Sequence, residues 1–376
     1  MEVICSRKVL HRGLQSVGRA VSGRSTLPIL ANVLLRATDQ GLSLLGTDLE
    51  IWMESLLPVE VKTSGEITVP ARLLSEVVGS LPEATVQLRT DDRGGLALVC
   101  GNSNYEIRCL PAEEFPALPE VGKETHFEVK QSLLAELIRK TVFAASSDET
   151  RQILTGALLQ WEGKQIRMVA TDSYRLSVKG AELEQKTKQE ISVIIPARAL
   201  HELLRFLDHG KEDGKVEVRI GPSQILFRLA GSEEEPGELC LVSRLVEGQF
   251  PKFDKFLSQQ YERRMSLHRE DFLAAIKRCL IIARAEANKL IFEPQPDRMK
   301  VRAESADYGR AEEELPISLE GEALQIAFNG EYLREALEAM GADLVWLELG
   351  GAVAPGLLRP GDDPDHLCIV MPMQIL

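Results

Sequence analysis

The 376-residue sequence lacks the features that mark membrane proteins and disulfide-stabilised secreted domains. It contains only six cysteines and no CxxC pair. We therefore expect buried, reduced thiols rather than a disulfide framework. No apolar run approaches the roughly 18 residues of a membrane span, and the first ten residues lack the apolar stretch of a signal peptide. These absences predict a cytoplasmic protein.

Sequence signatures of catalysis are also missing. There is no P-loop, no GxGxxG motif after a strand, no HExxH zinc motif and no GxSxG nucleophile motif. The six histidines are dispersed. The acidic runs 233–235 and 312–314 are consecutive residues, which cannot converge on one ion from a helix or a strand. We expect no catalytic residue, no metal site, no cofactor and no enzyme activity.

The net charge of −13 argues against a protein that is coated in nucleic acid. The average hides a local reversal, because the chain between residues 3 and 26 carries arginine and lysine but no acid. If residues 7–21 form a helix, Lys8, Arg12 and Arg19 lie on the side opposite the apolar residues. This segment therefore predicts a helix with one core-facing side and one cationic side.

The sequence repeats one pattern three times. The strand-like block LSLLGTD at 42–48 returns as IRMVATD at 166–172 and, more diverged, as MKVRAES at 299–305. A helix-opening segment follows each block, at 69–76, 195–202 and 328–335. A period of roughly 125–135 residues is the size of a domain and not of a solenoid repeat. We predict three copies of one domain, spanning 1–122, 123–255 and 256–376.

Each copy reads as helix, strands, helix, strands. The first helices are predicted near 7–21, 131–146 and 270–287, and the second helices open at Pro70, Pro196 and Asn329. Strand candidates are short apolar or alternating runs at 29–37, 51–61, 85–88, 96–100, 107–110, 216–220 and 225–229. The pattern predicts α+β domains, each with two helices packed on antiparallel sheet.

Cations recur on these helices away from the apolar stripes, at Lys8, Arg12, Arg72, Arg139, Arg198 and Arg278, with Arg205 close to that side. For a single helix, a solvated surface is the simpler interpretation. Repetition in an otherwise acidic protein favours a surface that contacts phosphate groups without reading bases. The sixth helix departs from the pattern, because Glu331, Glu335 and Glu338 accompany Arg334.

Two further segments differ between the copies. Residues 171–176 follow a strand and predict a tight turn with a capping aspartate, like residues 47–50. The C-terminal segment 369–376 is unusually apolar for a chain end and contains two methionines. It predicts either part of a permissive binding surface or a plain final strand.

Several of these motifs, in order and at matching spacing, resemble bacterial sliding clamps, the beta subunits of the replicative DNA polymerase III. They are GRSTLPIL at 23–30, GTDLE at 46–50, VPAR at 69–72, ATD at 170–172, RL at 175–176, FP at 250–251 and VMPM at 370–373. The resemblance runs from end to end. It implies a homodimer that closes a ring of six similar domains around duplex DNA. Such a processivity factor tethers the clamp loader, the polymerase and other DNA-processing proteins.

The resemblance also implies three sets of site residues. A pocket for short partner peptides would use Leu154, Thr171, Arg175, Leu176, Pro251, Asn329, Tyr332, Val370, Met371, Pro372 and Met373. DNA contacts would fall to Arg24, Arg72, Arg198 and Arg205, beside the helix cations Lys8, Arg12 and Arg139. The seam of the dimer would pair Tyr105 and Ile107 with Ile281 and Ile282.

The sequence departs from the family pattern at three places. One is the loop 147–153, which lacks the tyrosines and polar contacts that some relatives direct at DNA. Ser173 and Tyr174 stand where the family usually has Gly-His, and the ending 374–376 replaces the usual Arg-Leu. These departures leave open a specialised clamp paralogue with an altered partner pocket. A three-domain cytosolic enzyme with its site between repeats is the other alternative, although the missing catalytic signatures count against it.

Overall fold

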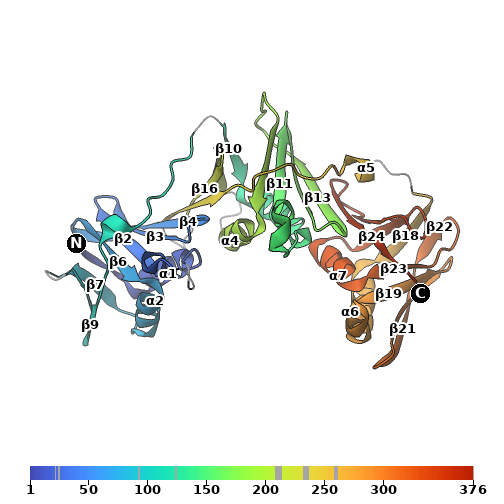
Figure 1. Ribbon diagram of the computed structural model, residues 1–376, viewed down its shortest axis with the longest axis horizontal. Coiled ribbons are helices and arrows are strands. Elements are labelled where there is room, and N and C mark those ends of the chain that lie inside the picture. Colours follow the sequence, from blue (N-terminus) through green and yellow to red (C-terminus); the bar gives the residue numbers. More distant parts are fainter. Residues whose placement is uncertain are drawn as a thin grey trace. The chain divides into compact units, whose positions relative to one another are not determined.

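A computed structural model describes residues 1–21, 23, 26–91, 94–122, 125–207, 214–231, 237–257 and 261–375 (Figure 1). Adjacent strands within these ranges are paired antiparallel. The chain divides into two compact units, residues 1–135 with 201–245 and residues 136–200 with 246–376. No helix in the described ranges is long and apolar enough to cross a membrane.

The first unit contains two sheets and two helices that pack on them. Its eight-stranded sheet has the order β10 (Thr125–Lys130), β15 (Lys215–Ile220), β16 (Gln224–Ala230), β17 (Glu238–Arg244), β4 (Ile51–Leu57), β3 (Gly41–Thr47), β2 (Asn32–Thr38) and β6 (Gly65–Pro70). Its five-stranded sheet has the order β5 (Glu60–Thr63), β1 (Glu2–Ser6), β7 (Thr85–Thr90), β8 (Leu96–Cys100) and β9 (Ser103–Ile107). The helices are α1 (Arg7–Val17) and α2 (Ala71–Ser80).

Helix α1 begins where the Ser6 hydroxyl accepts a hydrogen bond from the Val9 amide, at 3.2 Å. Its buried side holds Leu10, Leu14 and Val17 against the sheet. Gly13 lies so close to strands β3 and β4 that an added Cβ would come within 2.8 Å of the Leu44 side chain. The apolar side predicted from the sequence therefore faces the core.

The second unit has the same organisation. Its nine-stranded sheet has the order β14 (Ile191–Pro196), β11 (Gly156–Glu162), β12 (Gln165–Thr171), β13 (Arg175–Glu182), β26 (His366–Val370), β25 (Gly356–Pro360), β24 (Leu344–Leu349), β18 (Arg263–His268) and β22 (Ser318–Glu320). Its five-stranded sheet has the order β21 (Gly309–Pro316), β20 (Arg298–Ser305), β19 (Lys289–Pro294), β23 (Ile326–Asn329) and β27 (Pro372–Met373). The helices are α5 (Asp254–Leu257), α6 (Arg269–Ala283) and α7 (Gly330–Ala339). Helices α3 (Gln131–Arg139) and α4 (Ala197–Leu207) cross the division between the units.

The repeated copies share sheets instead of standing apart. Strand β4 of the first copy pairs with β17 of the second, from Ile51↔Ser243 to Leu56↔Glu238. Strand β13 of the second copy pairs with β26 of the third, from Arg175↔Val370 to Lys179↔His366. Each unit is therefore built around one seam between two copies.

Several predicted elements have different ends in the structure. Helix α1 ends at Val17 and α6 at Ala283, and α3 gives way after Arg139 to a 3-10 turn at Val142–Ala144. The strand predicted at 51–61 is two strands, because Pro58 has no amide hydrogen for the ladder.

Two other strand predictions need correction in the same way. Pro28 opens a 3-10 turn at Pro28–Ala31, so the strand predicted at 29–37 begins only at Asn32. The strand predicted at 107–110 is wrong. β9 ends at Ile107, and Leu110 forms only a single bridge to Thr68.

Candidate functional site

The turn between β12 and β13 is held by two side chains, as predicted for this segment. The Thr171 hydroxyl accepts from the Ser173 amide at 3.1 Å and donates to the Arg175 carbonyl at 2.5 Å. Asp172 Oδ1 accepts from the amides of Tyr174 and Arg175 at 2.9 and 3.0 Å. Ser173 adopts φ +82°, the left-handed conformation that favours glycine. The turn projects Tyr174 outward, with 60% of the residue exposed.

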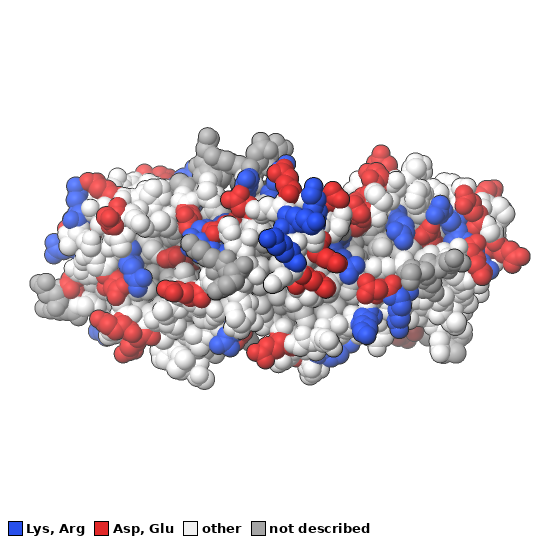
Figure 2. Space-filling model, turned by 90° about the horizontal axis from the view of Figure 1, so that it is seen from above, with Lys and Arg blue, Asp and Glu red and all other residues white. Residues whose placement is uncertain are grey.

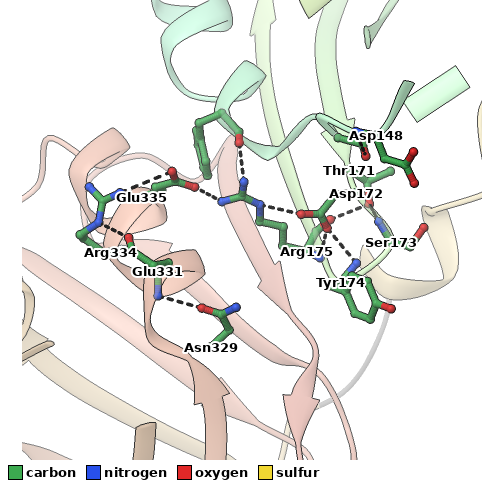
Figure 3. A network of polar contacts seen from close by, with 12 residues as sticks. Asp148, Thr171, Asp172, Ser173, Tyr174, Arg175, Asn329, Glu331, Arg334 and Glu335 are labelled. Atoms are coloured by element: carbon green, nitrogen blue, oxygen red, sulfur yellow. Dashed lines mark hydrogen bonds and ion pairs between the residues drawn. The ribbon is translucent and has the colours of Figure 1, made fainter. Parts of the chain in front are cut away.

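Arg175 joins this turn to two other parts of the second unit (Figure 3). Its guanidinium donates to Asp172 Oδ2 at 3.1 Å and to the Phe143 carbonyl at 2.7 Å, and it forms an ion pair with Glu335 of α7. It also lies over the Tyr332 ring, 4.6 Å from the centroid. Because two carboxylates surround a side chain that is only 11% exposed, its charge is largely neutralised within the protein.

The same surroundings disfavour ionisation of Tyr332. Burial, together with the nearby Asp172 carboxylate, raises the pKa of the Tyr332 phenol. Asn329 holds the start of α7, since its side chain accepts from the Glu331 amide at 2.9 Å.

A cavity of about 220 Å³ opens beside this turn. It is lined by Thr171, Ser173, Arg175, Leu176, Pro251, Lys252, Phe253, Phe256, Ile369 and Met371. Leu176 and Ile369 are directly paired across the β13–β26 seam and form the sheet side. Pro251, Lys252, Phe253 and Phe256 supply a further part of the lining. The Met371 amide donates to the Tyr174 carbonyl at 2.8 Å, which fixes the C-terminal segment against the turn.

The structure brings five of the predicted pocket residues to this cavity: Thr171, Arg175, Leu176, Pro251 and Met371. The other six do not line it. Leu154 and Val370 are buried, Tyr332 stacks on Arg175, and Asn329 caps α7. Pro372 and Met373 form β27, which pairs with β23. The C-terminal segment thus contributes both a final strand and one wall of the cavity.

Sequence reasoning missed the second wall. Lys252, Phe253 and Phe256 directly follow the Phe250-Pro251 motif and line the cavity. The aromatic spacing 250, 253, 256 was the available signal. Phe250 and Phe253 meet edge to face at 6.3 Å, and Arg167 lies over the Phe253 ring at 5.0 Å. The aromatic wall is therefore packed in place before any ligand binds.

The side chains predicted to contact DNA differ in how far they are exposed. Lys8, Arg139, Arg198 and Arg205 are exposed, Arg12 is half-buried, and Arg24 lies outside the described residues. The Arg72 side chain is 93% exposed and pairs with Glu76 at 2.8 Å. On the face shown in Figure 2, basic and acidic side chains are interspersed among the described residues.

The helices of the third copy differ from this pattern. Arg278 is bound by both carboxylate oxygens of Glu313, at 2.8 and 2.7 Å. Arg334 forms ion pairs with the three glutamates Glu331, Glu335 and Glu338 of its own helix. The exposed cation predicted at Arg278 is therefore neutralised, and the expectation for the sixth helix is matched by its ion pairs.

The residues predicted for a dimer seam lie on two elements. Tyr105 is 37% exposed on β9, an edge strand, whereas Ile107 is buried. Ile281 is 67% exposed on α6, and Ile282 packs against the core of the second unit. Strand β21 is one of the two edge strands of the last sheet, and β27 is the other. No cluster of three or more His, Cys, Asp or Glu side chains in the described ranges is arranged to hold a metal ion.

Comparison with known proteins extends over the whole chain. Three models match in order: the DNA polymerase III beta subunit N-terminal domain at residues 1–119, the central domain at 128–252 and the C-terminal domain at 255–374. The beta sliding clamp of Synechococcus elongatus is 33% identical, with 100% of both chains covered.

Solved structures agree. The DNA polymerase III subunit beta of Pseudomonas aeruginosa is 32% identical with a TM-score of 0.92, and 100% of both chains is covered. A sliding clamp of the same organism, bound to griselimycin, is 31% identical with a TM-score of 0.93 and the same coverage. Neither the specialised paralogue nor the three-domain enzyme finds support in these comparisons. The chain belongs to the family of DNA polymerase III beta subunits, the bacterial beta sliding clamps.

Proposed function

We propose that this chain is a processivity factor: two copies close a ring around duplex DNA and tether the replicative polymerase to it. The observation that supports this proposal most directly is a preformed, mostly apolar cavity at the β13–β26 seam. The cavity lies in a chain whose three parts all match beta-subunit domains. The protein performs no chemistry. It works as a topological tether in the cytoplasm.

The cavity binds short peptide segments of the clamp loader and of polymerases. Leu176, Ile369, Phe253 and Phe256 offer apolar contact, and the Arg175 network fixes the shape of the turn beside them. An apolar pocket with a few polar groups at its rim suits an extended peptide with apolar anchors. Leu154, Asn329, Tyr332, Val370, Pro372 and Met373 support this pocket from behind or beside it.

DNA is held by charge alone. Lys8, Arg12, Arg24, Arg72, Arg139, Arg198 and Arg205 neutralise phosphates, and none reads a base. Such contacts gain affinity from counterion release and permit sliding. The third copy contributes least, because Arg278 is held by both oxygens of Glu313 and Arg334 by three glutamates, whereas Arg72 has one exposed partner, Glu76.

The ring closes between strand β9 of one copy, with Tyr105 and Ile107, and helix α6 of the other, with Ile281 and Ile282. The edge strand β21 packs beside that helix. Unpaired edge strands are ready to extend a sheet across an interface. The boundaries between the three domains of the chain lie near residues 122 and 255.

The test is retention on DNA. The protein is loaded onto circular duplex DNA, separated from free protein by gel filtration, and the DNA is then linearised. A ring predicts stable retention on the circle and loss after linearisation. Equal dissociation from both forms, or a monomeric mass in solution, would contradict the proposal.

A further inference from the structure

The cavity described above has two cations in its lining, Arg175 and Lys252, and they differ in what surrounds them. Arg175 is held by two carboxylates, a carbonyl and an aromatic ring. It has little charge left to offer a ligand. It is a positioning residue for the turn.

Lys252 is exposed and lies between two residues that also line the cavity, Pro251 and Phe253. Among the described residues it makes no hydrogen bond, ion pair or ring contact. The next acid along the segment, Asp254, is already paired with Arg167 at 3.4 Å. Within the described part of the chain, the ammonium of Lys252 therefore has no compensating carboxylate at the rim of this apolar cavity.

Such a charge discriminates between ligands. An ammonium beside apolar surface is attracted to a carboxylate more strongly than it would be in bulk water, and it repels a second cation. The remaining lining offers little polar competition, since it is dominated by Leu176, Phe253, Phe256 and Ile369. Discrimination by charge at this rim therefore falls to one side chain.

We propose that Lys252 selects partner peptides that carry a carboxylate beside the apolar side chains that fill the cavity. This inference rests on the proposed function of the cavity and names the chemistry of its ligand. A DNA phosphate is the competing target for a lysine. The position of Lys252 in the lining, between two residues that wall the cavity, favours the peptide.

The experiment uses three synthetic capped peptides that share a leucine–phenylalanine anchor and differ at one adjacent position: Asp, Asn or Lys. Affinities for the full-length protein are measured by fluorescence anisotropy at low and high salt. We expect the native protein to prefer the Asp peptide over the Asn peptide by about two- to fivefold, the range of exposed ion pairs. The preference should vanish at about 1 M salt, where the Debye length is about 3 Å.

Variants separate the possible causes. Lys252→Ala should bind the Asp and Asn peptides equally, and Lys252→Glu should prefer the Lys peptide. Lys255→Glu is the matched control: it makes the same charge change three residues on, at a side chain that lies over Phe256 and does not line the cavity. It should keep the native preference for Asp.

The outcomes distinguish the inference from the function beneath it. Equal affinity of native protein for the Asp and Asn peptides would overturn the role of Lys252 alone. If Lys252→Glu keeps peptide selectivity but shortens retention on circular DNA, the lysine serves phosphate and the inference is also overturned. Failure of all three peptides to bind the native protein would contradict the proposed pocket itself.

Discussion

The first and second copies contain the same turn with different consequences. In the first copy, the Thr47 hydroxyl accepts from the Leu49 amide at 2.9 Å, and Asp48 Oδ1 accepts from the Glu50 and Ile51 amides at 3.1 and 3.0 Å. These bonds repeat those of Thr171–Arg175, and Leu49 has φ +76° where Ser173 has +82°. The backbone of the turn is therefore a property of the repeat.

The side chains around the two turns are not repeated. Trp52, directly after the first turn, is buried with Phe115 and Leu49 in one apolar cluster. Leu176 occupies the corresponding place after the second turn, where it is buried in a second apolar cluster with Phe253 and Ile369 and also lines a cavity. A large side chain completes a core where a smaller one leaves a binding site. Repetition supplies the scaffold, and substitution within the repeat supplies the pocket.

The largest expected effect is on the stability of the first copy, where Trp52 is packed in the apolar cluster. Trp52→Ala should lower the free energy of unfolding by about 3–5 kcal/mol, because it leaves a large hole in a packed cluster. Leu176→Ala should cost only about 2 kcal/mol, because one side of Leu176 already faces a cavity. Urea denaturation measures both. Equal costs would show that the two places are packed alike.

The second turn should depend on Arg175, which has no cationic counterpart in the first. Arg175→Ala should lower the free energy of unfolding by about 3 kcal/mol, since it leaves the buried Asp172 carboxylate without its cation and removes one of the two cations paired with Glu335. Affinity for the Asp peptide should fall by more than about tenfold, or 1.4 kcal/mol. Arg175→Lys keeps the charge without the planar fork and should be intermediate in both measurements. If Arg175→Ala kept native stability and native peptide affinity, the Arg175 network would contribute to neither.

The β13–β26 seam, which follows the second turn, should be destabilised by acid more than the β4–β17 seam, which follows the first. Burial, with a contribution from Lys140, lowers the pKa of His366 in β26 to about 4, from an ordinary value of 6.5. The folded state binds the proton less well than the unfolded chain. Its stability is therefore greatest above pH 6.5 and falls as the pH drops from 6.5 towards 4.

We expect the native protein to lose about 2 kcal/mol of stability over this range. This is less than the whole pKa shift would give at 1.36 kcal/mol per pKa unit. His366→Gln should flatten the pH dependence of urea denaturation. The control is His126→Gln, at a side chain of the first unit that is 46% exposed. An unchanged pH profile in His366→Gln would show that His366 does not cause the loss of stability in acid.

The smallest effect concerns the strained residue of each turn. Ser173→Gly should stabilise the protein by about 0.5 kcal/mol, because relief of about 1 kcal/mol of left-handed strain exceeds the entropy cost of glycine. Leu49→Gly should destabilise it, since Leu49 packs against the buried cluster around Trp52. Thermal unfolding of the two variants measures this difference in sign. Stabilisation by both would mean that Leu49 contributes no packing.

Much of the fold could be predicted from periodicity. The repeated block LSLLGTD and its copies predicted the turns, and Pro70 and Pro196 predicted helix starts one residue away. Pairings between copies could not be predicted, because β4 and β17 are brought together only by folding. The neutralisation of Arg278 was also hidden, since Glu313 lies on β21, 35 residues further along the chain.

The pocket was predicted in part for a similar reason. The turn, Leu176 and Met371 carry motifs, whereas Phe253 lies just before the one-turn helix α5 and Phe256 lies on it, outside the repeated blocks. No period assigns a face to such a segment. Only the structure shows that it folds back to form a wall.

The central claim is that the size of one side chain after the turn decides between core and pocket. The most direct measurement is peptide binding by Leu176→Trp, which copies Trp52 into the second turn. Calorimetric titration with the Asp peptide should give one site per native chain. In Leu176→Trp the site should be lost, with native dimer mass and circular dichroism retained. Undiminished binding by a correctly folded Leu176→Trp protein would contradict the account.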